Sequence, residues 1–153
     1  MIERSSFPSP WSLKGFMDEI YNPVSRLWAL MTDDTLIGYI CFWMFADEIH
    51  LLNIAVEPEK RHSGFGKLLL NKMIETGSAQ GIGMVWLEVR PSNLAAINFY
   101  QAAGFRQAYR RIRYYRDTNE DAIIMSLDLA TKKTYTYSTD EIPATCPVGS
   151  DSR

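Results

Sequence analysis

The stretch LLNIAVEPEKRHSGFGK, residues 51–67, decides the fold class of this chain. Its first six residues are apolar apart from one asparagine, as in a buried strand, and Glu57-Pro58 ends that run. Gly64 and Gly66 then mark a turn, and a helical pattern begins at Lys67. A helix N-terminus presents unpaired N–H groups and a partial positive charge, and glycines let an anion come close. The stretch therefore predicts a strand, a phosphate-binding loop and a helix.

The spacing of this loop excludes two common nucleotide-binding motifs. The nucleoside-triphosphate loop G-x-x-x-x-G-K-[ST] requires a glycine at 61 and a hydroxyl residue at 68, where the chain has Arg61 and Leu68. The dinucleotide motif G-x-G-x-x-G requires a third glycine at 69, where the chain has Leu69. The pattern R-x-x-G-x-G remains, and a plain strand-to-helix turn without a ligand is an open alternative for it.

Composition indicates one compact domain over residues 1–130. The whole chain of 153 residues is 46% hydrophobic, and its net charge of −2 argues against direct binding of nucleic acid or of an anionic membrane. No apolar run approaches the ~20 residues that cross a bilayer, and no signal peptide is recognisable. The two cysteines and the isolated His50 and His62 predict no disulfide framework and no metal site. We expect a cytoplasmic, metal-free protein with a disordered tail over residues 131–153.

The apolar periodicity predicts an α/β fold. It indicates helices over 13–21, from 65 to near 81 and from 93 to 104, and strands over 27–32, 35–45, 49–56, 84–90, 106–115 and 122–129. Their order implies a single mixed sheet flanked by helices. For the middle helix we expect the inner face to consist of Phe65, Leu68, Leu69, Met73 and Ile74.

Several further segments resemble one enzyme family in order and spacing. They are FPSPWS (7–12), EIHLLNIAVEP (48–58), WLEVRPSN (86–93), AAINFY (95–100), GF (104–105), RYY (113–115) and EDAIIM (120–125). With the glycine loop, they are similar to the bacterial ribosomal-protein-alanine N-acetyltransferases, the RimI family of the GNAT superfamily. The resemblance runs from about residue 2 to residue 129. It implies the acyl-CoA N-acyltransferase fold and direct acetyl transfer from acetyl-CoA to the N-terminal alanine of a small-subunit ribosomal protein.

The resemblance also implies how the co-substrate is held. The strand that ends in Ile54, Ala55 and Val56 splays from its neighbour at a bulge, and its backbone pairs with the pantetheine. The pyrophosphate lies on the loop residues His62, Ser63, Gly64, Phe65, Gly66 and Lys67. Asn93 contacts coenzyme A. For the side chains of His62 and Ser63, a role as ordinary solvated loop residues is an open alternative.

Two residues correspond to the catalytic positions of the family. In the strand 84–90, alternation places Val85, Leu87 and Val89 on one face and Glu88 and its neighbours on the other. The resemblance makes Glu88 the general base and Tyr100 the acid that protonates the departing thiolate. A solvated pair of Glu88 with Arg90, and a plain core aromatic at Tyr100, are open alternatives.

The resemblance also implies which aromatic residues line the groove for the acceptor peptide. Tyr114 and Tyr115, at the end of a strand, resemble the tyrosine pair that lines the peptide-entry groove of N-terminal acetyltransferases, and Trp11 is a second candidate for that groove. An exposed strand end and core packing are the respective alternatives.

The sequence departs from the family pattern at its beginning. The family has a first strand and most of a helix ahead of FPSPWS, so we expect 27–32 to be an unpaired sheet edge, and a shortened chain or a misassigned start codon to be the cause. Two rival functions stay open: acetylation of lysine or a small amine, and a catalytically idle module that binds coenzyme A. The oligomeric state is not predicted.

Overall fold

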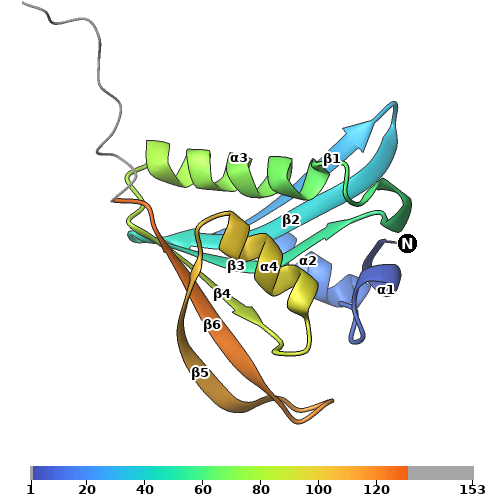
Figure 1. Ribbon diagram of the computed structural model, residues 1–153. Coiled ribbons are helices and arrows are strands. Elements are labelled where there is room, and N and C mark those ends of the chain that lie inside the picture. The colour runs from blue at the N-terminus through green and yellow to red at the C-terminus, as the bar shows by residue number, and fades with distance from the viewer. Residues whose placement is uncertain (1, 131–153) are drawn as a thin grey trace, which may run out of the picture.

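The computed structural model describes residues 2–130, and the predicted tail 131–153 lies outside the described residues. Its sheet has six strands in the order β1-β2-β3-β4-β6-β5 (Figure 1). The strands are β1 Ser25–Thr32, β2 Thr35–Phe45, β3 Glu48–Val56, β4 Met84–Val89, β5 Arg106–Tyr115 and β6 Glu120–Asp128. The helices are α1 Ile2–Ser6, α2 Leu13–Tyr21, α3 Phe65–Ala79 and α4 Leu94–Ala102, with a 3-10 turn at Pro58–Lys60.

The sheet is mixed, as the order of the elements predicts. β1, β2 and β3 are antiparallel neighbours, β3 and β4 are parallel, and β4, β6 and β5 are again antiparallel. The one parallel pair is joined through α3, because parallel strands need a crossover connection. β1 lies at one edge of the sheet and β5 at the other. The edge position expected for residues 27–32 is thereby confirmed.

Helices cover the sheet on two sides (Figure 1). α3 and α4 pack on one face over the main core, which contains Leu70, Met73, Phe42 and Leu87. The opposite face carries α1 and α2 above a smaller cluster around Tyr39. β2 is therefore buried on both faces from Ile37 to Phe42, which is why its sequence is apolar without alternation.

The first helix is the element that the sequence did not predict. α1 has five residues, too few for a helical period to be visible. Its serines Ser5 and Ser6 both bond the carbonyl of Ile2, at 2.9 and 2.6 Å. The next helix begins as Ser12 suggests, because its hydroxyl accepts the N–H of Gly15 at 3.1 Å.

The inner face of α3 differs from the predicted one at one residue. Leu69, Met73 and Ile74 are buried as expected, whereas the Leu68 side chain is 53% exposed. Leu70 takes its place in the core and has no exposed surface. The prediction for Leu68 was wrong because three leucines in a row at 68–70 leave the rotation of the helix undetermined.

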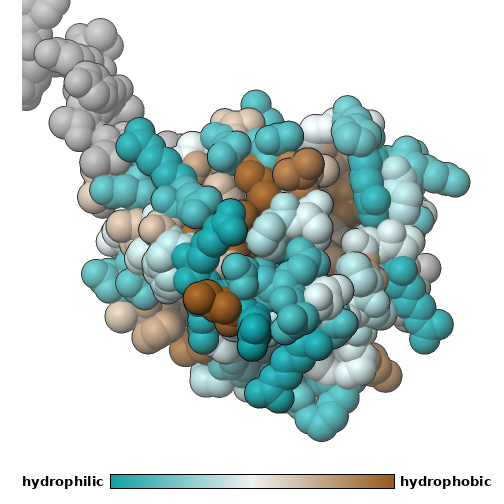
Figure 2. Space-filling view, turned by 60° about the horizontal axis from the view of Figure 1, so that its bottom comes forward, coloured by the Kyte–Doolittle hydropathy of each residue, from teal (hydrophilic) through white to brown (hydrophobic). Residues whose placement is uncertain are grey.

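The surface at the lower end of the molecule in Figure 1 is largely hydrophilic. With the lower end of Figure 1 turned toward the viewer, polar side chains cover most of the face and hydrophobic patches are small (Figure 2). Within residues 2–130, no helix has both the length and the apolar character needed to cross a bilayer.

Leu70→Ala is expected to lower the free energy of unfolding by about 2–5 kcal/mol, because it removes buried methyl groups and leaves a cavity. Leu68→Ala, two residues away in the same helix, is the matched control and should cost under ~1 kcal/mol. Urea denaturation followed by circular dichroism measures both. Equal losses in the two variants would contradict the assigned rotation of α3.

Candidate active site

The site begins where two neighbouring strands separate. β3 pairs with β4 only from Glu48–Met84 to Leu51–Leu87. At this point β3 also has a bulge against β2, since Cys41 pairs with Asn53 and Phe42 with Leu51, which leaves Leu52 without a partner. Beyond the bulge, no strand within the described range 2–130 pairs with residues 53–56 on the side toward β4. A backbone edge is thus left open here, at a bulge such as the family resemblance implies.

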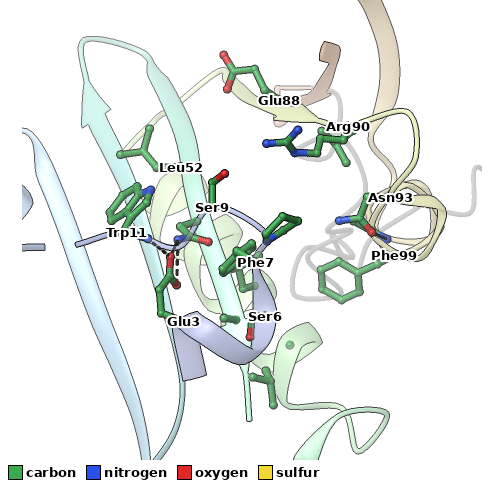
Figure 3. Close-up of a pocket in the computed structure, with 18 of the residues that line it drawn as sticks. Glu3, Ser6, Phe7, Ser9, Trp11, Leu52, Glu88, Arg90, Asn93 and Phe99 are labelled. Carbon is green, nitrogen blue, oxygen red and sulfur yellow. Dashed lines mark hydrogen bonds between the residues drawn. The ribbon is translucent and has the colours of Figure 1, made fainter. Parts of the chain in front are cut away.

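A cleft of about 420 Å³ opens at this divergence. Figure 3 shows Trp11, Leu52 and Glu3 on one side of it and Asn93 and Phe99 of α4 on the other. Among the predicted site residues, the cleft is lined by Trp11, Ile54, Ala55, Val56, Gly66, Glu88, Asn93, Tyr100 and Tyr115. Residues that are up to 104 positions apart in sequence, Trp11 and Tyr115, are brought together here.

The remaining predicted residues lie outside the lining of the cleft. They are His62, Ser63, Gly64, Phe65 and Lys67 of the loop, and Tyr114 on β5. The loop residues precede and open α3, whose first hydrogen bond runs from the N–H of Leu68 to the carbonyl of Gly64 at 2.9 Å. The N–H groups of residues 65–67 consequently have no acceptor within the helix. Gly64 caps the helix with φ +86°, a conformation that favours glycine.

Arg61 fastens this loop to the rest of the site. Its Nε donates to the carbonyl of Val56 at 3.0 Å, and its Nη2 donates to the hydroxyl of Ser6 at 2.9 Å. The guanidinium thereby joins the end of β3, the glycine loop and α1. The local sequence pattern did not indicate these hydrogen bonds of Arg61.

Asn93 and Tyr100 occupy the two ends of α4 and both reach the cleft. Asn93 is the N-cap, and its Oδ1 accepts the N–H of Ala96 at 3.1 Å. Tyr100 is 8% exposed and packs edge-on against Phe99 and tilted against Phe105. Burial raises the pKa of Tyr100 well above that of a free phenol, so its hydroxyl is protonated at neutral pH.

Glu88 follows the alternation that the sequence predicts. Val85, Leu87 and Val89 are buried in the main core, and Glu88 points to the other face, where its side chain is 17% exposed. Its Oε2 lies 2.8 Å from Nε2 of His50. This hydrogen bond raises the pKa of His50, although burial works in the opposite direction.

Arg90 does not pair with Glu88. It donates through Nη2 to both carboxylate oxygens of Asp117, at 2.8 and 3.0 Å, and its guanidinium lies 3.9 Å above the ring of Tyr115. The alternative of a solvated Glu88–Arg90 pair is therefore wrong.

A buried carboxylate that the sequence analysis missed supports the N-terminal side of the cleft. Glu3 is 3% exposed, and its Oε1 accepts the backbone N–H of Trp11 at 2.7 Å. The hydroxyl of Tyr39 donates to Oε2, and the amide of Asn53 lies within 3.5 Å of both oxygens. The pKa of Tyr39 is raised far above its usual range, mainly because the phenol is buried and to a lesser extent because it bonds Glu3. No signal in the sequence marks this long-range group of bonds.

The hairpin of β5 and β6 forms the opposite side. The hydroxyl of Ser9 donates to Oδ2 of Asp117 at 2.6 Å, which connects the N-terminal segment with this hairpin across the cleft. The Ser9 bond and the Arg90 guanidinium hold the pKa of Asp117 below its usual value. Tyr115 lines the cleft, and burial raises its pKa to about 12. Tyr114 instead packs edge-on against Tyr115, with ring centroids 5.1 Å apart.

Comparison with known proteins settles the family. Residues 1–105 match the family model described as acetyltransferase (GNAT) family. The chain belongs to the GNAT family. It is 37% identical over 131 residues to the ribosomal protein bS18-alanine N-acetyltransferase of Salmonella typhimurium, covering 84% of this chain and 88% of that relative. This similarity confirms the resemblance to the ribosomal-protein-alanine N-acetyltransferases.

Solved GNAT structures agree with the fold. The crystal structure of the ribosomal-protein-S18-alanine N-acetyltransferase from Escherichia coli superposes with a TM-score of 0.77 at 36% identity, covering 84% of this chain and 83% of that one. The paia N-acetyltransferase of Thermoplasma acidophilum, solved in complex with coenzyme A, has a TM-score of 0.63 at 26% identity, covering 75% of this chain and 70% of that one. The expected acyltransferase fold is confirmed.

Glu3→Ala is expected to destabilise this GNAT domain by about 3 kcal/mol, because it leaves the Trp11 N–H, the Tyr39 hydroxyl and the Asn53 amide without an acceptor. Thermal unfolding by calorimetry measures the loss. Arg4→Ala, an exposed neighbour in α1, is the control and should leave the melting temperature within about 1–2 °C. A Glu3 variant as stable as this control would refute the structural role of Glu3.

Proposed function

We propose that the protein is an acetyl-CoA-dependent Nα-acetyltransferase that acetylates the N-terminal alanine of a small-subunit ribosomal protein in the cytoplasm. The relatives with this activity in their names are matched over more than four fifths of their length. The single observation that carries the proposal is the cleft, in which Glu88, Tyr100 and the strand edge 53–56 face one cavity.

The residues of the cleft fit an acyl-CoA. The open edge of Ile54, Ala55 and Val56 offers backbone groups to the amides of the pantetheine, as an added strand would use them. The N–H groups at the start of α3 suit the pyrophosphate. A Cβ on Gly66 would lie 3.6 Å from ring atoms of Phe99 and 3.9 Å from Val56, so this glycine keeps the cleft open between loop and helix. Asn93 lines the same cavity. Among residues 2–130, no cluster of three or more metal-ligating side chains occurs.

The proposed chemistry needs one base and one acid. Acetyl-CoA supplies an activated thioester, and the chain must free the acceptor amine of a proton and protonate the leaving sulfur. Glu88, a carboxylate at the cleft, takes the ammonium proton through a water. Tyr100, held protonated by burial, donates to the sulfur. The only cysteine among the described residues, Cys41, is buried outside the cleft, which favours direct transfer in a ternary complex over an acetyl-cysteine intermediate.

The difference in pKa between the two kinds of amine favours an α-amine over a lysine as acceptor. With a pKa of ~7.7–8.0, an α-amine is about 10–15% neutral at pH 7, whereas a lysine side chain at ~10.4 is below ~0.1%. The difference of about 2.5 units corresponds to ~3.4 kcal/mol of deprotonation. A carboxylate such as Glu88 is a modest base and is suited to the easier of these tasks.

The test is an acetylation assay read by mass spectrometry. We expect a peptide that starts with alanine to gain one acetyl group at its α-amine in the presence of enzyme and acetyl-CoA. The same peptide with a blocked N-terminus and an internal lysine, and a polyamine, are the controls. Product on the lysine or the polyamine alone would favour the rival acetyltransferases. Binding of coenzyme A without any product would favour an idle module.

Glu88→Gln and Tyr100→Phe should each lower kcat by about 10²–10⁴-fold, the range expected for loss of a general acid or base. The affinity for coenzyme A should stay within threefold, because neither change closes the cleft. Steady-state kinetics with the alanine peptide and calorimetric titration of coenzyme A measure the two quantities. An unchanged kcat in either variant would remove that residue from the proposed chemistry.

Gly66→Val should weaken coenzyme A binding at least about tenfold, or ~1.4 kcal/mol, because its methyl groups occupy the cleft beside Phe99. Gly64→Val should also weaken binding, since valine is strained at φ +86°. Gly83→Ala, whose Cβ would meet only the Asp47 carbonyl at 3.8 Å, serves as the control. Calorimetric affinities that stay unchanged in both loop variants would refute the assignment of the loop.

A further inference from the structure

His50 and Glu88 meet just where β3 and β4 separate. His50 pairs in register with Trp86, and Glu88 lies one residue beyond the last pair, Leu51–Leu87. Both side chains lie on the face of the sheet opposite the main core, because Ile49, Leu51 and Leu87 are buried within it. The distance from Nε2 of His50 to Oε2 of Glu88 is 2.8 Å. Within residues 2–130, no other side chain hydrogen-bonds this carboxylate.

Glu88 stands between two cavities. One is the main cleft, and the other is a smaller cavity of about 260 Å³ that Glu88 and His50 both line. Figure 3 shows the carboxylate of Glu88 at the top of the view, with Phe99 and Ser6 below it. Tyr109 and Arg111 of the edge strand β5 line the smaller cavity, and the His50 side chain is 33% exposed. A path therefore leads from the cleft through Glu88 and His50 to water.

We propose that His50 is a positioning residue for Glu88 and carries the proton that Glu88 receives from the acceptor amine to the water of the smaller cavity. This inference rests on the proposed function and assigns a role that the family resemblance did not include.

Proton balance requires such a route. An acceptor ammonium has three N–H protons and the amide product keeps one. One of the two lost protons goes to the sulfur of coenzyme A, and the other must leave the enzyme in each turnover. Glu88 receives this second proton, and the neutral imidazole of His50 accepts it and releases it to solvent. Glu88 is then again a carboxylate, and no oxidant or further reactant is needed.

The surroundings of His50 suit both parts of the role. The carboxylates of Glu88 and Glu48 favour its charged form, the guanidinium of Arg111 opposes it, and Trp43 of β2 packs edge-on against the ring at 6.0 Å. The pKa of His50 is raised overall, chiefly by the hydrogen bond to Glu88, which makes the imidazole a stronger base. Trp43 is itself held by Glu19 at 2.7 Å, which fixes the plane against which the imidazole packs.

A plain surface ion pair would be the simpler reading of this contact. Exposed pairs contribute little, and their loss should leave turnover unchanged. Glu88 is a candidate for the reaction and not a distant surface charge, so a change in its hydrogen bond to His50 should alter kcat. The two readings thus differ in a measurable way.

The experiment compares His50→Gln and His50→Ala with the wild type, using the alanine peptide. Glutamine can still donate a hydrogen bond to Glu88 but cannot accept a proton. We expect kcat to fall about tenfold in His50→Gln and about 10–100-fold in His50→Ala, with KM for both substrates within threefold. Added imidazole should restore part of kcat in His50→Ala, and more so at higher pH, where more of it is neutral. Tyr109→Phe, in the wall of the same cavity, is the matched control and should keep full activity.

A second measurement tests the hydrogen bond between His50 and Glu88 in the absence of turnover. NMR titration of the His50 ring should give a pKa above 6.5 in the wild type and a lower one in Glu88→Gln, because the hydrogen bond is the main cause of the shift. Full activity of His50→Ala, or a loss that imidazole does not restore, would overturn the proton route. An inactive wild type would overturn the proposed function, and the role of His50 with it. An active wild type with unaffected His50 variants would overturn the inference alone.

Discussion

The separation of β3 from β4 after Leu51 and Leu87 is the constraint on which the rest of the molecule depends. Up to this pair, the strands share a ladder and carry the main core. Beyond it, the bulge at Leu52 turns β3 away and leaves a backbone edge without a partner. Such an edge is costly if buried and dry, so it needs a ligand or water. Every group assigned to the reaction lies within reach of this opening.

Polar side chains hold the opening at a fixed width. Glu3 ties the N-terminal segment to β2 and β3, Arg61 ties the glycine loop to the end of β3, and Arg90 ties β4 to the turn between β5 and β6. The contacts of Glu3 with Tyr39 and of Arg90 with Asp117 join elements that are distant in sequence. Most are buried or partly buried, where a satisfied hydrogen bond counts for more than at the surface.

Much of the fold could be predicted from the sequence because local patterns determine it. Alternation in 84–90 placed Glu88 on the correct face, and the glycine pattern marked the start of α3. The rotation of α3 could not be predicted, since Leu68 and Leu70 are equally apolar and only packing separates them. Glu3 and His50 were missed for a related reason. Their roles depend on strand register and on contacts across 36 and 38 positions, which no local pattern contains.

The bond between Ser9 and Asp117 has a consequence for the order in which the enzyme is completed. The segment proposed to hold the donor, residues 53–67, is synthesised well before β5 and β6, which form the facing side of the cleft. A nascent chain that ends before β5 would contain the proposed coenzyme A segment but would lack Tyr115, which lines the opposite side of the cleft. The contact between Ser9 and Asp117 can form only after the turn that follows β5 has been synthesised, so the proposed acceptor side of the cleft is completed later than the proposed coenzyme side.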